Sequence, residues 1–201
     1  MIRIHNFPRG ARGVRAGWVC EEMGLDYEFA AVTYPPSEAF IRLNPLGTVP
    51  VLEDGAATIT ESLAIMLYLA EAHGPTPLLP PRDDPAFAQV LELAMFGEAS
   101  LGASLNPLLA ARFSAPAELK RNWPVGMLEG RVEKFLDHLS ARLGENAYLV
   151  GSGLTLADIC VETSLQIWQG ALAGAIPDNL AAYRDRLKAL ETYQRAMAAQ
   201  A

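Results

Sequence analysis

The sequence predicts a two-part protein, with an α/β domain first and an all-helical domain after it. Over the first 75 residues, strand-like and helix-like patterns alternate. Residues 74–85 then contain five prolines, which neither a helix interior nor a central strand tolerates. Beyond them the strand patterns nearly vanish, and apolar residues recur at helical spacing. We therefore expect an α/β domain over 1–75, a linker over 76–85 and a helical domain over 86–201.

The first domain has the pattern of a mixed sheet with helices packed against it. Ile2 and Ile4 alternate with polar neighbours, as in a short strand. Asp54-Gly55 is a strong hairpin signal, so the strands on either side of it should run antiparallel. After the first strand we expect a helix over 14–23 capped by Gly24, a strand over 27–32, a helical turn over 40–43, strands over 49–52 and 58–59, and a helix over 62–73. The resulting order is β-α-β-α-β-β-α.

The second domain should be a bundle of helices. The expected helices cover 91–101, 106–112, 125–143, 155–169 and 180–199. The fourth of them has a well-specified start, because Thr155 supplies an N-cap hydroxyl and Asp158 supplies a carboxylate three residues later. This capping box predicts a structural role for Asp158, whose charge also suits the positive end of the helix dipole.

Composition and charge exclude several classes of function. Hydrophobic residues make up 51% of the chain and charged residues 19%, which indicates a packed core rather than disorder. The net charge of −7 repels nucleic-acid phosphates and anionic lipids, so neither is an expected partner. No apolar run reaches the ~20 residues of a membrane helix, and the first residues lack the apolar core of a signal peptide. We expect a soluble, cytoplasmic protein.

The cysteines and histidines do not indicate a metal or redox site. The two cysteines, Cys20 and Cys160, lie far apart and form no Cys-x-x-Cys motif. We expect both to be reduced, buried thiols. The three histidines show no ligand-like spacing with one another or with the cysteines, so no metal is expected.

Two short motifs in the first domain carry candidate binding chemistry. Pro50 stands at the head of an apolar strand, where it cannot donate to the ladder. A cis Val49-Pro50 bond would leave the backbone of Val49 free to pair with an extended peptide ligand; an ordinary trans proline at an edge strand is the alternative. Glu61 and Ser62 begin a helix, and together they match the ammonium and carboxylate groups of an α-amino acid. A plain N-terminal cap is the alternative for this pair.

The order and spacing of these motifs closely resemble the glutathione-binding half of cytosolic glutathione transferases. The matching residues are Asn44-Pro-Leu-Gly-Thr-Val-Pro-Val-Leu and, after a short interval, Glu61-Ser-Leu-Ala-Ile. The stretch 153–159 resembles the capping-box helix of that family's second domain, and 193–196 resembles a C-terminal segment common in bacterial members. The resemblance implies a thioredoxin-like first domain, a helical second domain, glutathione as co-substrate and a homodimer.

By this resemblance, the first domain holds glutathione and the second holds the other substrate. Val49, with Thr48 and Pro50, would bind the cysteinyl backbone, although many relatives carry lysine near the position of Thr48. Glu61 and Ser62 would bind the γ-glutamyl end. The apolar residues expected to line the electrophile pocket are Met95, Phe96 and Phe113. Simple helix packing is the alternative for each of the three.

The segment over 6–15 departs from the family's pattern. Family members activate the thiol of glutathione with a Tyr, Ser or Cys in this segment, and this chain has none of these there. Lowering the thiol pKa by two units requires about 2.7 kcal/mol of preferential interaction with the thiolate. We expect this stabilisation from the Asn6 amide, the charge of Arg9 or Arg12, and backbone N–H groups at the helix start. In the alternative, Arg9, Arg12 and Arg15 are solvated charges or bind the glycyl carboxylate of glutathione.

The leading hypothesis is therefore a transferase that conjugates the thiolate of glutathione to a small apolar electrophile by proximity and anion stabilisation. A first rival is a protein of the same fold that binds glutathione or an apolar ligand without turnover, which the missing hydroxyl favours. A second is another glutathione-dependent reaction, such as isomerisation, dehalogenation or peroxide reduction. A third is a protein-interaction domain.

Overall fold

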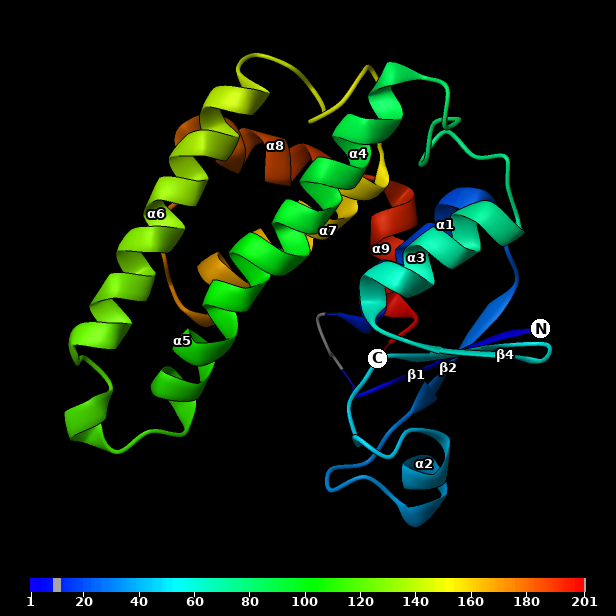
Figure 1. The fold of residues 1–201 in the computed structure, drawn as a ribbon, viewed down its shortest axis with the longest axis horizontal. Helices are drawn as coiled ribbons and strands as arrows, with labels where there is room; N and C mark the ends of the chain where they lie inside the picture. Colours follow the sequence, from blue (N-terminus) through cyan, green and yellow to red (C-terminus); the bar gives the residue numbers. More distant parts are fainter. Residues whose placement is uncertain (9–11, 201) are drawn as a thin grey trace. The chain divides into compact units, whose positions relative to one another are not determined.

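The computed structural model describes residues 1–8 and 12–200, and the chain forms two compact units (Figure 1). One unit comprises residues 1–79 and the segment from Lys188 onward, and the other comprises residues 80–187. The sequence patterns placed the segment from Lys188 onward in the helical domain, whereas its packing groups it with the α/β unit. Local patterns identify a helix but not the surface against which the helix packs.

The α/β unit is built on a four-stranded sheet of order β2-β1-β3-β4. The strands are β1 (Ile2–Asn6), β2 (Tyr27–Ala31), β3 (Val51–Asp54) and β4 (Ala57–Thr60). β1 runs parallel to β2 and antiparallel to β3, and β3 pairs antiparallel with β4 across the Asp54-Gly55 turn. The turn places Gly55 at a φ of +59°, which glycine adopts without steric cost. The predicted mixed sheet and hairpin are confirmed.

Helices α1 (Gly13–Met23), α2 (Glu38–Leu43) and α3 (Ser62–Ala72) alternate with these strands along the chain. Figure 1 shows α1 and α3 on one side of the sheet and α2 on the other. α1 ends at Gly24, which adopts a left-handed conformation with φ +65° and donates its N–H to the last turn, as the sequence predicted. On the α2 side, Phe40 packs with Val32 and Val51 in a small hydrophobic core.

The second unit is helical throughout its described elements. Its helices are α4 (Pro85–Met95), α5 (Ala103–Phe113), α6 (Trp123–Leu143), α7 (Leu156–Gln166) and most of α8 (Asp178–Lys188), with π-helical turns η1 (Phe96–Gly102) and η3 (Ile167–Ala171) and a 3-10 turn η2 (Ala117–Leu119). Gly97 lets η1 approach α7 closely, since a Cβ there would lie 2.9 Å from the carbonyl carbon of Cys160. None of the described helices is both long and apolar enough to span a bilayer.

The predicted capping box is confirmed at the start of α7. The Asp158 carboxylate accepts the backbone N–H and the hydroxyl of Thr155, both at 2.8 Å. It also accepts the backbone N–H of Leu149 and the hydroxyl of Tyr183, both at 2.9 Å. Four donors therefore hold this buried carboxylate, and its role is to join three segments of the helical unit.

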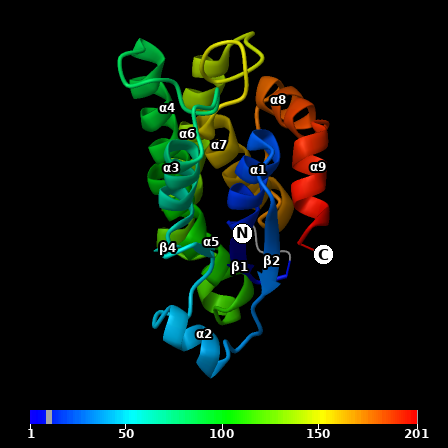
Figure 2. The same ribbon diagram turned by 90° about the vertical axis from the view of Figure 1, so that its right-hand side faces the viewer.

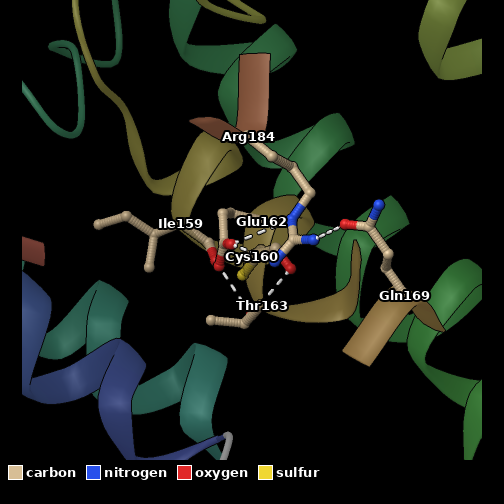
Figure 3. Close-up of polar contacts among 6 residues, drawn as sticks. All are labelled: Ile159, Cys160, Glu162, Thr163, Gln169 and Arg184. Carbon is tan, nitrogen blue, oxygen red and sulfur yellow. Dashed lines mark hydrogen bonds and ion pairs between the residues drawn. The ribbon is translucent and has the colours of Figure 1, made fainter. Parts of the chain in front are cut away.

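A second buried polar cluster links α7 to α8 (Figure 3). Arg184 donates Nε and Nη2 to Glu162 Oε1 at 3.2 and 3.1 Å, and it donates Nη1 to Gln169. Thr163 donates its hydroxyl back to the carbonyl oxygens of Ile159 and Cys160. The ion pair is almost fully shielded from solvent, with 0% of the Glu162 side chain and 7% of the Arg184 side chain exposed.

The single helix predicted over 180–199 is wrong, because the chain breaks there into α8 and α9 (Glu191–Ala198). The break falls beside Lys188, where the chain passes from the helical unit to the α/β unit. α9 packs beside α1 (Figure 2), and the rings of Trp18 and Tyr193 meet edge to face at 4.9 Å. Arg195 also donates to Glu21 at 2.6 Å. α8 thus buries its apolar residues in the helical unit, and α9 buries its own in the α/β unit.

Candidate functional site

The start of α3 carries a strained residue next to a buried hydroxyl. Glu61, the residue before α3, has a φ of 70° and a ψ of 112°, a region that non-glycine residues seldom occupy. Such conformations cost about 1–3 kcal/mol and gather at functional sites. Ser62 follows as the first residue of α3, with 3% of its surface exposed. The backbone N–H groups of the first helical turn and the Ser62 hydroxyl therefore lie close together as hydrogen-bond donors, which is the arrangement of an anion-binding helix start.

Arg15 lies beneath this helix start, in the first turns of α1. It is only 1% exposed, and its Nη1 donates to Ser62 Oγ at 3.0 Å. The alternative that Arg15 is a solvated charge is therefore wrong. The sequence held one signal of its burial, since Arg15 stands between Val14 and the apolar stretch 16–20 at helical spacing from Val19.

The loop before β3 presents the backbone of Val49. The Val49-Pro50 bond is cis, so the alternative of an ordinary trans proline is wrong, and the ladder of β3 begins only at Val51. Asn44 is buried and holds the loop from below, with its Nδ2 donating to the carbonyl of Thr48 at 2.7 Å and its Oδ1 accepting the Leu46 N–H at 3.2 Å. Thr48 and Val49 thus occupy a fixed loop outside the strand pairing.

The end of β1 and the start of α1 hold the groups expected to stabilise a thiolate. Asn6 is buried, and its Nδ2 donates to Gln200 Oε1 at 2.7 Å. Gly13 packs against the Asn6 amide so tightly that a Cβ would come within 2.1 Å of it. Arg12 is the half-buried N-cap residue of α1, and Arg9 lies outside the described residues. A cavity of about 60 Å³ adjoins Asn6, with Phe7, Pro8 and Gln200 among its lining residues.

Both halves of the chain match domains of one protein family. Residues 13–72 match the Glutathione S-transferase, N-terminal domain, and residues 126–200 match the Glutathione S-transferase, C-terminal domain. Over 167 residues the chain is 32% identical to glutathione S-transferase 3 of Zea mays, which covers 78% of this chain and 73% of that protein. The chain belongs to the glutathione transferase family.

The chain is also similar to a protein named as an elongation factor and to a solved structure that contains glutathione. The chain is 30% identical over 162 residues to a probable elongation factor 1-gamma 1 of Arabidopsis thaliana, a match that covers 77% of this chain but only 36% of that protein. The solved structure of a glutathione transferase homolog from Lodderomyces elongisporus, with two GSH per subunit, has the same fold. Its TM-score is 0.86 at 22% identity, covering 98% of this chain and 97% of that one.

The residues that the family resemblance assigned to the electrophile pocket differ in exposure and packing. Met95 and Phe113 are 52% and 66% exposed. Phe96 instead packs its ring against Phe135 and His138, at centroid distances of 5.2 and 5.5 Å. The helical unit also contains a cavity of about 730 Å³ with a mixed lining, in which Leu108, Arg112, Arg121, Asn122, Val125 and Trp168 take part. Met95, Phe96 and Phe113 are not among the residues that line it.

Other reactive groups of this family member are engaged in packing. Burial raises the pKa of the Cys20 thiol to about 12, so the thiol stays neutral and unreactive near pH 7. Cys160 is buried as well. Within residues 1–8 and 12–200, no three His, Cys, Asp or Glu side chains gather in a way that could hold a metal ion.

Proposed function

We propose that this chain binds reduced glutathione in its α/β unit and conjugates the thiolate to a small apolar electrophile. The observation that carries the proposal is the start of α3, where strained Glu61 and buried Ser62 stand beside the Arg15 guanidinium. The γ-glutamyl end of glutathione carries an α-carboxylate and an ammonium group. The carboxylate suits the Ser62 hydroxyl and the helix N-terminus, and the ammonium suits the exposed Glu61 carboxylate.

The loop before β3 would hold the middle of the tripeptide. Val49 lies outside the ladder of β3, so its backbone would pair with the cysteinyl residue as an added strand does. Thr48 and Pro50, on either side, would complete the wall of this subsite. The buried Asn44 amide keeps the loop in place for such a ligand.

Thiolate stabilisation is assigned to Arg12, Asn6 and Arg9, with the first of these carrying most of it. Arg12 stands at the N-terminus of α1, where its charge adds to the positive end of the helix. The Asn6 Nδ2 group donates one of its two hydrogens to Gln200, and its contribution to a thiolate would come from the other. A thiol pKa two units below its usual ~8.5 needs about 2.7 kcal/mol, which one guanidinium in a partly dry site supplies.

By the family resemblance, the electrophile would bind at exposed apolar side chains of the helical unit, among them Met95 and Phe113. Phe96 would support that surface through its packing on Phe135. We further propose that the protein acts as a cytoplasmic homodimer, as its family suggests.

A non-catalytic glutathione-binding protein is the second candidate. The segment over 6–15 has no Ser, Thr, Tyr or Cys to donate to a thiolate, and a family relative bears the name of an elongation factor. The ultraviolet absorbance of the thiolate, titrated against pH with glutathione and excess protein, separates the two candidates. A thiolate band that appears well below pH 8.5 supports the transferase, and Arg12→Ala should remove the shift. Calorimetric binding without a shifted band would favour the non-catalytic protein.

A further inference from the structure

We infer that Arg15 is a positioning residue that turns the Ser62 hydroxyl into a dedicated donor for the α-carboxylate of the ligand. The inference rests on the proposed function, in which Ser62 binds the γ-glutamyl end of glutathione. Arg15 itself reaches Ser62 from α1 and is buried, so it acts on the ligand through this hydroxyl.

The direction of the hydrogen bond follows from the chemistry of the two groups. A guanidinium only donates, whereas a serine hydroxyl has one hydrogen to give and two lone pairs to accept with. The contact of 3.0 Å therefore runs from Arg15 Nη1 to Ser62 Oγ. The hydroxyl hydrogen must then point away from Arg15, toward a group that can accept it. Either oxygen of a carboxylate accepts that hydrogen, whereas a carboxamide accepts it only through its carbonyl oxygen and carries no charge to strengthen the bond.

The positive charge of Arg15 also favours a carboxylate at this site. Its side chain is almost fully buried, so water and salt screen it less than a surface charge. It lies against the N-terminus of α3, which is already the positive end of the helix. A hydrogen bond donated by a charged group also polarises the next one in a chain, so the Ser62 hydroxyl becomes a stronger donor. Arg15 should therefore increase the preference of the site for an ionised carboxylate over a neutral carboxamide.

The test compares two ligands on the whole chain by calorimetry. One ligand is glutathione, and the other is the same tripeptide with its γ-glutamyl α-carboxylate converted to a carboxamide. We expect the wild-type chain to prefer glutathione by at least about tenfold, the range for a hydrogen bond to a charged group. Arg15→Gln keeps a donor of similar shape but removes the charge, and it should reduce this preference to about threefold or less. Arg15→Lys, which keeps the charge, should retain most of it.

Two further results separate positioning from mere support of the fold. If Arg15 only fills space, Arg15→Gln weakens both ligands equally and leaves their ratio unchanged, which would overturn the inference. The double variant Arg15→Gln/Ser62→Ala should discriminate no worse than Ser62→Ala alone, because Arg15 acts through that hydroxyl. If Arg15→Gln does not fold, as judged by circular dichroism, Arg15→Lys and Ser62→Ala still decide the matter. A preference that Ser62→Ala leaves intact would then refute the role.

The proposed function can fail separately from this inference. A wild-type chain that binds no glutathione overturns the proposed site, and the inference falls with it. A wild-type chain that binds glutathione, with a ratio that Arg15→Gln does not alter, overturns the role of Arg15 alone.

Discussion

Replacing Arg184 by methionine removes the positive partner of a carboxylate that has no exposed surface. In the wild-type chain, Arg184 Nη2 lies 3.1 Å from Glu162 Oε1, and Nε lies 3.2 Å from the same oxygen (Figure 3). At 3.1 Å and an effective dielectric constant of ~20, the attraction between two unit charges is about 5 kcal/mol. Desolvation of both groups offsets much of this attraction in the intact pair. Removal of one partner leaves the other with its desolvation penalty uncompensated.

The Arg184→Met variant should therefore lose about 3–5 kcal/mol of unfolding free energy at pH 7. Urea unfolding followed by circular dichroism measures this loss as a lower midpoint with an unchanged slope. Arg142→Met is the matched control, because Arg142 lies in the same unit but is 39% exposed and 4.0 Å from Glu92. The control should cost no more than about 1 kcal/mol.

A double variant identifies the mechanism. Glu162→Leu/Arg184→Met should be more stable than Arg184→Met alone, since the buried carboxylate is removed together with its positive partner. An Arg184→Met variant no less stable than Arg142→Met would refute the reasoning, because the Glu162 site would then not be desolvated.

Three further predictions concern single side chains. Hydrogen bonds from His73, which has the larger effect, and Tyr68 lower the pKa of Asp54, so Asp54→Asn should cost about 1 kcal/mol at pH 6. These hydrogen bonds stabilise only the ionised Asp54 carboxylate, so the urea midpoints of the variant and the wild type should converge as the pH falls below the pKa of Asp54. A difference between the midpoints that stays constant with pH would contradict this role of Asp54. Cys20 should resist iodoacetamide at pH 8 until urea unfolds the chain, and mass spectrometry would detect labelling of the native protein if the thiol were accessible. Gly97→Ala should destabilise the fold by an overpacking cost of about 1–3 kcal/mol, which thermal unfolding would detect as a lower midpoint. Gly126→Ala is the control, because open space surrounds Gly126, and it should leave the midpoint unchanged.

Local signals predicted most of the fold. The hairpin at Asp54-Gly55, the left-handed cap at Gly24 and the capping box of Thr155 each depend on a few neighbouring residues, and the structure contains all three. The break between α8 and α9 gave no such signal, because no glycine or proline lies there, and it coincides with the passage of the chain from one unit to the other. A periodic pattern shows which face of a helix is apolar, but it does not show where the partner surface ends.

The candidate site also has some features that short sequence motifs indicate and others that only the folded chain reveals. The proline before β3 and the Glu61-Ser62 helix start are visible in the sequence, but taken alone they favour a trans proline and a plain cap. The family resemblance, rather than local backbone chemistry, pointed to the cis bond that the structure contains. The burial of Arg15 and its contact with Ser62 join residues 47 positions apart, so only the folded chain brings them together. The exposure of Met95 and the packing of Phe96 likewise depend on neighbours from other helices.

The link between Asn6 and Gln200 bears most directly on how a thiolate would be stabilised. The bond joins the end of β1 to the last described residue of the chain, so the C-terminal segment orients the Asn6 amide. It engages one of the two hydrogens on Asn6 Nδ2, which leaves a neutral amide only the other hydrogen with which to stabilise a thiolate. A guanidinium carries its full positive charge whatever neutral groups it contacts. We therefore propose that Arg12, through its charge, contributes the larger share of thiolate stabilisation, and that Asn6 forms a wall of the site held by Gln200.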